Sequence, residues 1–117
     1  MSKLTTHVLD NSRGMPGAGM VMQLFQLVDH RRTHILTTKT NGDGRCDVPL
    51  LSGEQFKVGV YELDFHAGDY FIAQGVSTPQ PAFVDVVTLR FGVADTSRDC
   101  HVPLLVTPWA YSTYRGS

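Results

Sequence analysis

Three side chains suited to hydrolytic chemistry stand far apart in this sequence: two histidines and one arginine. His7 lies in a run of alternating polar and apolar residues, Arg45 follows a Gly-Asp-Gly turn, and His101 opens an apolar run near the C-terminus. A neutral imidazole can accept a proton from water near pH 7. A guanidinium stays charged and offers a planar fork of donors to a carbonyl or enolate edge. Brought together, these groups could activate water and stabilise an oxyanion.

Each of these side chains also has an interpretation without catalysis. Most histidines are not catalytic, so His7 could be a half-exposed strand residue, and His101 could hydrogen-bond to the backbone of a turn. Arg45 could be a solvated charge. The histidines are not interpreted as a zinc site, so no metal is predicted. The other histidines are interpreted as surface or loop residues: His30, His34 and His66.

Length, charge and cysteine content limit the class of protein. A chain of 117 residues is expected to be a single domain, residues 1–117, with a core of its own. The net charge of −1 provides no basic field for nucleic acid. Cys46 and Cys100 favour free thiols in a reducing compartment over a disulfide. Since no apolar run has the length of a membrane span or signal peptide, we expect no membrane association and a cytoplasmic location.

The elements that must position these residues are mostly strands, because apolar residues recur at every second position far more often than every 3.6. The clearest strand is residues 83–93, in which Phe83 and Val87 are predicted to share one face and Val84 and Val86 the other. Seven further strands are predicted, separated by turn residues: residues 4–9, 20–28, 33–38, 46–50, 56–65, 101–106 and 111–115.

Only one segment has a helical pattern. In residues 66–74, Tyr70 and Phe71 can pack against a core, and Gly75 is placed to end the helix. The pattern alone therefore predicts an all-β sandwich of about eight strands with one short helix.

Three segments together resemble the transthyretin family, and the resemblance spans the whole chain. Residues 4–10 resemble the family's first strand, residues 40–45 its middle motif, and residues 101–117 its last two strands. The closing Tyr-Arg-Gly-Ser of residues 114–117 resembles the C-terminus of the 5-hydroxyisourate hydrolases, whereas the hormone-carrying transthyretins replace it. One departure is Asp99, which stands where many family members have a histidine. The resemblance implies a transthyretin-like (prealbumin) β-sandwich in two sheets.

The resemblance also implies an activity and a site. The reaction is the hydrolysis of 5-hydroxyisourate to 2-oxo-4-hydroxy-4-carboxy-5-ureidoimidazoline in urate catabolism, without a cofactor. Water attacks a ring carbonyl and the ring nitrogen leaves. His7 and His101 are expected to position and deprotonate this water, with His101 slightly favoured as the base, while Arg45 stabilises the oxyanion. Ser117 is expected to organise the histidines through its hydroxyl or its terminal carboxylate. Substrate contacts are implied for His7, Arg45, Tyr114, Arg115 and Gly116.

The partners implied are the small-molecule substrate and three further copies of the chain. By resemblance, the protein is a homotetramer whose active sites lie at subunit interfaces, where strand faces line a central channel. An alternative function is a carrier of a small aromatic ligand in that channel. A carrier favours apolar walls, whereas His7, Arg45, His101 and Tyr114 would make the channel polar. A purely structural module is a third alternative, which the closing tetrapeptide disfavours.

Overall fold

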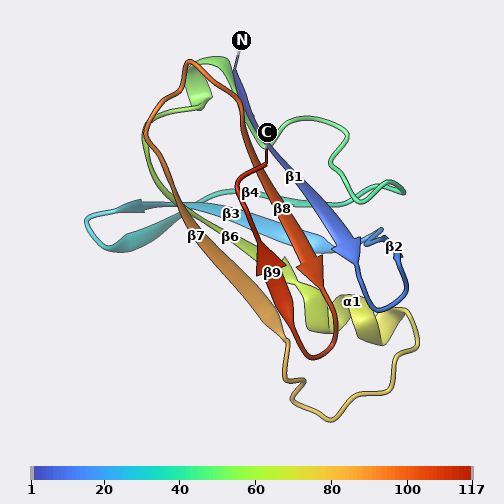
Figure 1. Cartoon of the computed structure of the whole chain (residues 1–117). Helices are drawn as coiled ribbons and strands as arrows, with labels where there is room; N and C mark the ends of the chain where they lie inside the picture. The colour runs from blue at the N-terminus through green and yellow to red at the C-terminus, as the bar shows by residue number, and fades with distance from the viewer. Residues whose placement is uncertain (1, 117) are drawn as a thin grey trace.

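Two stacked β-sheets make up most of the molecule (Figure 1). The structure is a computed structural model that describes residues 2–116, and within these residues the sheets hold nine strands. The first sheet has the order β2-β1-β8-β9, and β5 also pairs with β1. Its strands are β1 (Lys3–Asp10), β2 (Met15–Pro16), β5 (Leu51–Ser52), β8 (Cys100–Val106) and β9 (Tyr111–Thr113).

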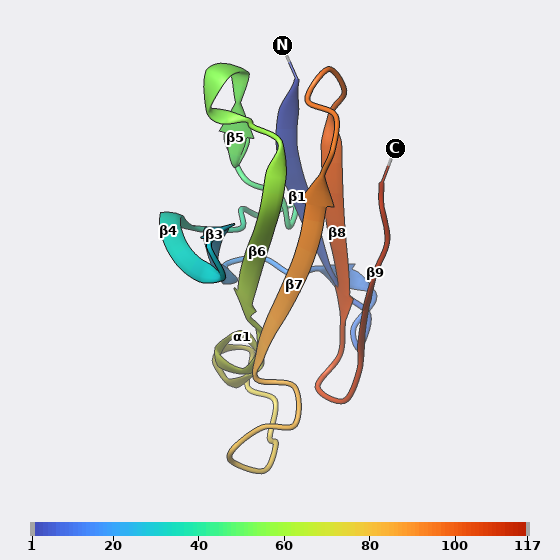
Figure 2. The same ribbon diagram turned by 90° about the vertical axis from the view of Figure 1, so that its left-hand side faces the viewer.

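The second sheet has the order β4-β3-β6-β7 and is antiparallel throughout. Figure 2 shows it beside the first sheet, with the single α-helix at one end of the pair. Its strands are β3 (Val21–Val28), β4 (Arg31–Lys39), β6 (Gly59–His66) and β7 (Val86–Val93). The all-β, two-sheet sandwich predicted from the sequence is therefore confirmed.

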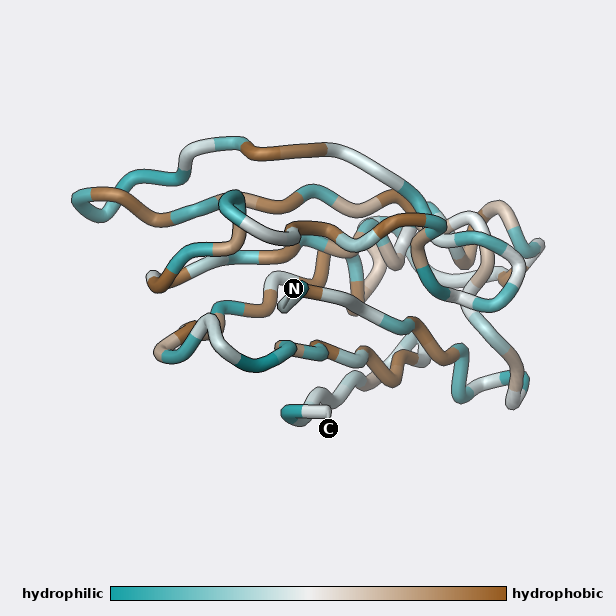
Figure 3. The backbone as a smooth tube through the Cα atoms, turned by 90° about the horizontal axis from the view of Figure 1, so that it is seen from above, coloured by the Kyte–Doolittle hydropathy of each residue, from teal (hydrophilic) through white to brown (hydrophobic). Residues whose placement is uncertain are grey.

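The core lies between the sheets and is built from alternate residues of the strands. In β1, Leu4, Thr6 and Val8 are buried, while Thr5 and His7 between them face outward and are only half-buried. Leu63 of β6 and Leu104 of β8 fill the core from opposite sheets. Figure 3 shows the resulting alternation of hydrophobic and hydrophilic residues along the strands. This alternation leaves one face of β1 and β8 available for polar side chains.

The predicted helix is present as α1 (Ala67–Ala73), one residue shorter at each end than the sequence indicated. It packs Tyr70 and Phe71 into the core. Gly75 ends it with a φ of +80°, and its N–H donates to the Ile72 carbonyl while that of Val76 donates to Phe71. This pair of bonds is the Schellman arrangement that a glycine just past a helix permits. A 3-10 turn, η1 (Gly53–Gln55), precedes β6.

Two details of the predicted strands are wrong. Residues 46–50 form no strand: Val48 is 70% exposed, and Pro49 has no N–H to donate to a ladder. Phe83 does not share a face with Val87, because β7 begins only at Val86. Before that point the chain turns, so that Phe83 is exposed and Val84 is buried. Within β7 itself the predicted alternation holds.

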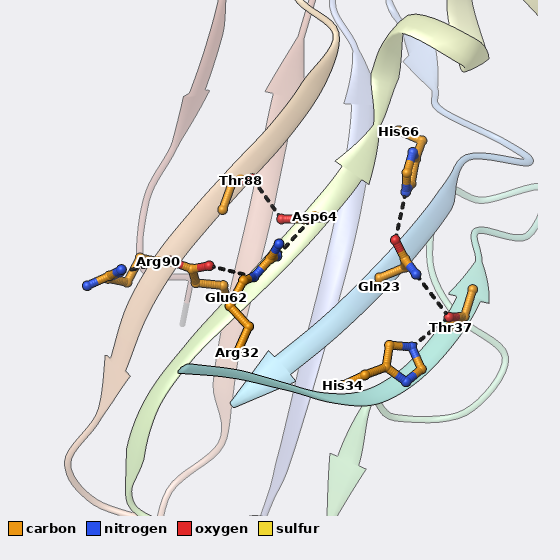
Figure 4. Close-up of polar contacts among 9 residues, drawn as sticks. All are labelled: Gln23, Arg32, His34, Thr37, Glu62, Asp64, His66, Thr88 and Arg90. Carbon is orange, nitrogen blue, oxygen red and sulfur yellow. Dashed lines mark hydrogen bonds and ion pairs between the residues drawn. The ribbon is translucent and has the colours of Figure 1, made fainter. Parts of the chain in front are cut away.

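The outer face of the second sheet carries a network of charged and polar side chains (Figure 4). Arg32 of β4 contacts Glu62 at 2.9 Å and Asp64 at 2.7 Å, and Arg90 of β7 contacts Glu62 at 2.9 Å. Both carboxylates are buried beneath these guanidiniums, which satisfy charges that would otherwise be costly to cover. The ion pairs join β4, β6 and β7, with β3 lying between β4 and β6, so the network ties the sheet together across its outer face.

Candidate active site

The two candidate histidines lie on one face of the first sheet, on adjacent strands. β1 and β8 are parallel, although 96 residues separate the paired positions, and their register places Thr5 opposite His101 and His7 opposite Pro103. Thr5, His7 and His101 therefore all point away from the core, and all three are half-buried. The parallel register of β1 and β8 is what brings these three side chains together on that face.

Arg45 joins the histidines through a backbone pairing with His7. The two residues form an isolated antiparallel bridge, so the segment after the Gly-Asp-Gly turn meets β1 on the edge opposite β8, between its pairings with β5 and β2. The N–H of Val8 donates to the Gly44 carbonyl at 2.8 Å. Gly44 has a φ of +75°, and a Cβ at this position would collide with the Val8 carbonyl. Only glycine lets the turn approach β1 closely enough to deliver Arg45.

The side chain of Asn41 holds this turn in shape. Its oxygen accepts hydrogen bonds from the N–H groups of Asp43 at 2.9 Å and Arg45 at 3.1 Å, and its amide donates to the Asp47 carboxylate at 3.0 Å. An asparagine that caps its own turn in this way is a frequent local motif. Sequence reasoning placed no functional weight on Asn41, although the Asn-Gly pair was recognised as a turn.

The turn also fixes the ring of His7. Nε2 of His7 lies 3.0 Å from the Asp43 carbonyl oxygen. Because a carbonyl can only accept, Nε2 must carry a proton, and in the neutral ring the lone pair is then on Nδ1. The backbone of the turn thus selects one tautomer of His7 while it positions Arg45.

His101 is held on two sides. Its Nδ1 lies 2.8 Å from the Thr5 hydroxyl, and its carbonyl accepts the Gly116 N–H at 2.9 Å. Gly116 packs so closely on the imidazole that a Cβ there would lie 2.5 Å from Cδ2. Burial lowers the pKa of His101, and the neighbouring charges of Arg45 and His7 lower it further. Burial is the largest of these causes.

A polar cleft opens beside this face, with a volume of about 500 Å³. Asp99, at its rim, accepts a hydrogen bond from the Lys3 N–H at 3.0 Å, so the residue that departs from the family pattern ties the start of β1 to β8. The cleft is lined by Lys3, Thr5, Thr6, Arg45, Cys46, Asp47, Val48, Pro49, Leu50, Asp99 and His101.

The residues near the C-terminus, Tyr114, Arg115 and Gly116, do not line this cleft. Tyr114 and Arg115 are exposed and line a second hollow of about 310 Å³, together with residues of β7 and β8. His101 borders both hollows, whereas Gly116 contacts its ring directly. The structure therefore brings Arg45, His7, His101 and Gly116 together in one chain and places Tyr114 and Arg115 to one side. Ser117 lies outside the described residues.

Two searches of residues 2–116 bear on metals and membranes. No group of three or more histidine, cysteine, aspartate or glutamate side chains in this range is arranged to hold a metal ion. None of its helices is long and apolar enough to cross a membrane.

Fold and site together define a β-sandwich domain with a polar histidine–arginine site on the outer face of one sheet. A sequence profile described as the HIUase/Transthyretin family matches residues 4–116. The chain belongs to this family.

Comparison with individual proteins separates the branches of the family. The chain is 61% identical to a 5-hydroxyisourate hydrolase of Ralstonia nicotianae, over 100% of both chains. It superposes on the crystal structure of an (S)-allantoin synthase with a TM-score of 0.93 and 42% identity, covering 99% of this chain and 44% of that one. A sea bream transthyretin in complex with thyroxine gives a TM-score of 0.87 at 29% identity, covering 97% and 94%. The fold is thus shared with a thyroxine-bound transthyretin, but the sequence identity to the Ralstonia nicotianae hydrolase is about twice as high.

Proposed function

We propose that this protein is a 5-hydroxyisourate hydrolase, which opens its cyclic substrate with water. The observation that carries the proposal is the parallel register of β1 and β8. This register sets His7 and His101 on one face, and Arg45 is paired to the same strand. Identity of 61% to a named hydrolase over the full length supports it. The cleft is lined by charged side chains of both signs, Lys3, Arg45, Asp47 and Asp99, which suit a polar, planar ring better than an apolar ligand and so disfavour the carrier alternative.

Each group has a role that its surroundings suit. His101 is the base: burial and nearby positive charge favour its neutral form, which can take a proton from water. Arg45 is exposed at the cleft, where its guanidinium binds the substrate's oxygen-rich edge and stabilises the oxyanion. His7, whose Nε2 is held by the Asp43 carbonyl, helps to position water. Tyr114, Arg115 and Gly116 are proposed substrate contacts, and Ser117 a group that organises the histidines.

The proposal includes a homotetramer with its active sites at subunit interfaces. Both sheets end on the same side of the sandwich, at β7 and β9, and residues from both strands border one hollow. Within residues 2–116, no strand pairs with the outer edges of β7 and β9. Unpaired edges are templates for strand pairing with another chain. A pair of chains joined at these edges still has its His7–His101 faces free to meet a second pair.

The test is the ultraviolet absorbance of freshly generated 5-hydroxyisourate, followed with and without the protein. We expect faster decay that survives chelators and needs no added cofactor. His101→Ala and Arg45→Ala should each slow turnover about a hundredfold or more, as deletion of a general base or oxyanion donor typically does. His34→Ala, an exposed histidine on the other sheet, is the matched control and should retain wild-type turnover. Decay at the uncatalysed rate with the wild-type protein would refute the proposal.

A further inference from the structure

Thr5 is the nearest polar partner of the His101 imidazole. Its hydroxyl oxygen lies 2.8 Å from Nδ1, and the two residues are directly paired across the parallel β1–β8 ladder. Both side chains are half-buried, and the Thr5 branch at Cβ leaves its hydroxyl few rotamers within a strand. The register of the sheet therefore fixes the contact between Thr5 and His101.

The partner of Nδ1 determines what Nε2 can do. A neutral imidazole has one N–H and one lone pair, so a proton on Nδ1 leaves the lone pair on Nε2, and the reverse. A hydroxyl can either donate or accept, and it can rotate between the two. After Nε2 has taken a proton, both ring nitrogens carry N–H groups, and the Thr5 oxygen can then only accept.

The contacts of the His101 ring leave Nε2 as the nitrogen that can act as the base. Thr5 occupies Nδ1, and Gly116 covers the edge formed by Cγ and Cδ2. Nε2 is the ring nitrogen left for the cleft, which His101 lines together with Arg45. His7 is held in the opposite way, through its Nε2. The nitrogen without a protein partner is therefore Nε2 in His101 and Nδ1 in His7.

We propose that Thr5 is a positioning residue for His101: its hydroxyl accepts the Nδ1–H of the neutral imidazole and so keeps the Nε2 lone pair available as the base. This inference rests on the proposed hydrolase function, since only a reaction that needs a base at His101 benefits from it. When Nε2 takes the proton of the attacking water, the same hydrogen bond stabilises the imidazolium. The Thr5 hydroxyl can therefore accept the Nδ1–H in both the neutral and the protonated ring, and the imidazole keeps the same orientation.

The first test needs no substrate. In protein labelled with ¹⁵N in its histidine rings, the shifts of neutral His101 should show a protonated Nδ1 and a bare Nε2. Thr5→Val keeps the branched shape but removes the hydroxyl, so the proton should move largely to Nε2, the tautomer that free histidine favours. Thr5→Ser should restore the wild-type pattern. A proton on Nε2 of neutral wild-type His101 would overturn the inference.

The second test is kinetic. Thr5→Val should lower kcat by about tenfold to a hundredfold, the size of loss expected from a misplaced catalytic group, with KM changed less than about twofold. In a His101→Ala background the same substitution should cost nothing further, because Thr5 acts through His101. Thr107→Val is the matched control, since the Thr107 hydroxyl donates to the Ala110 carbonyl in the turn between β8 and β9, away from both hollows. It should lower stability but leave the His101 tautomer and kcat unchanged.

The outcomes separate the two proposals. If wild-type protein does not accelerate substrate decay, the hydrolase function fails, while the tautomer measurement still reports on Thr5. If wild-type protein is active but Thr5→Val matches it in kcat, or loses activity equally with and without His101, the role of Thr5 fails alone. A rise in KM without loss of kcat would make Thr5 a substrate contact and equally contradict the inference.

Discussion

At the scale of single residues, the smallest side chain in the candidate site has a steric role. Gly116 lies against the His101 ring, and a Cβ there would come within 2.5 Å of Cδ2 and 3.1 Å of Cγ. We therefore expect Gly116→Ala to rotate the imidazole or displace the chain end, and to reduce kcat/KM by about tenfold or more. The assay is substrate decay. Gly42→Ala is the control, because a Cβ at Gly42 meets nothing within 4 Å; equal activity of the two variants would refute the steric role.

The lowered pKa of His101 predicts the pH dependence of the activity. Burial, Arg45 and His7 all disfavour the imidazolium. A base must be neutral to act, so kcat/KM should be constant near neutral pH and fall only below the ordinary histidine value of 6.5. Arg45→Gln removes one of the causes, so its acid limb should shift to higher pH, besides the general loss of rate. A wild-type limb centred above 6.5 would contradict this assignment of the base.

The site was predicted from the sequence only in part. Because alternate residues of a strand share a face, the predicted strand of residues 4–9 places Thr5, His7 and Leu9 together, and the resemblance to the family's middle motif pointed to Arg45. The Thr5–His101 contact could not be predicted, because it depends on parallel pairing between positions 96 residues apart. The Asp43 carbonyl that fixes His7 was missed for a similar reason: a backbone acceptor leaves no signal in residue types.

At the scale of elements, a buried carboxylate ties the end of β1 to α1. Asp10 is fully buried and accepts hydrogen bonds from Ser12, from Arg13 at 3.1 Å and from the Tyr70 hydroxyl at 2.8 Å. Burial raises the pKa of Asp10, but the hydrogen bonds from Ser12, Tyr70 and Arg13 outweigh it, so the pKa lies below its ordinary value. These hydrogen bonds anchor the turn after β1 to α1, the helix that follows β6 of the second sheet.

Removal of one of these bonds should weaken the whole domain. We expect Tyr70→Phe to lower the free energy of unfolding by about 1–3 kcal/mol, because it removes one donor to a buried charge. Urea denaturation measures this, with the exposed Tyr111→Phe as control. Since the folded-state pKa is depressed, the stability that Asp10 contributes is complete above its ordinary value of 3.8 and is lost as the pH falls through the lower folded-state value. A difference between wild type and Tyr70→Phe that is unchanged at low pH would contradict the assignment.

Some element boundaries differ from those that the sequence patterns predicted. The strand after residues 20–28 was predicted to begin at residue 33, yet β4 begins at Arg31. Asp29 and His30 form the two-residue loop between β3 and β4, both with positive φ, a conformation more often signalled by glycine or asparagine. Residues 46–50 were predicted as a strand from apolar composition, but Val48 and Pro49 line the cleft. Long alternating strands were thus predictable, whereas short connections near the site were not.

At the scale of the whole molecule, the proposed tetramer depends on the side of the sandwich where β7 and β9 lie. β7 and β9 each end a sheet on that side. Antiparallel pairing of each strand with its counterpart in a second chain would continue both sheets and satisfy their free backbone groups. Joining two such pairs through the faces that carry His7 and His101 would place each cleft at an interface.

The expected assembly is a tetramer of about 52 kDa from chains of 12.9 kDa, measured by light scattering after size exclusion. Ser112→Asp places a carboxylate at the centre of β9, where pairing about a two-fold axis would bring it near its own copy, so the measured mass should fall. Its matched control is Ser112→Thr, which suits a strand and carries no charge. If the clefts are completed by neighbouring chains, the specific activity of Ser112→Asp should fall together with its mass and recover at high protein concentration. A monomeric wild-type protein with full activity would eliminate the shared site and leave catalysis to the residues of one chain.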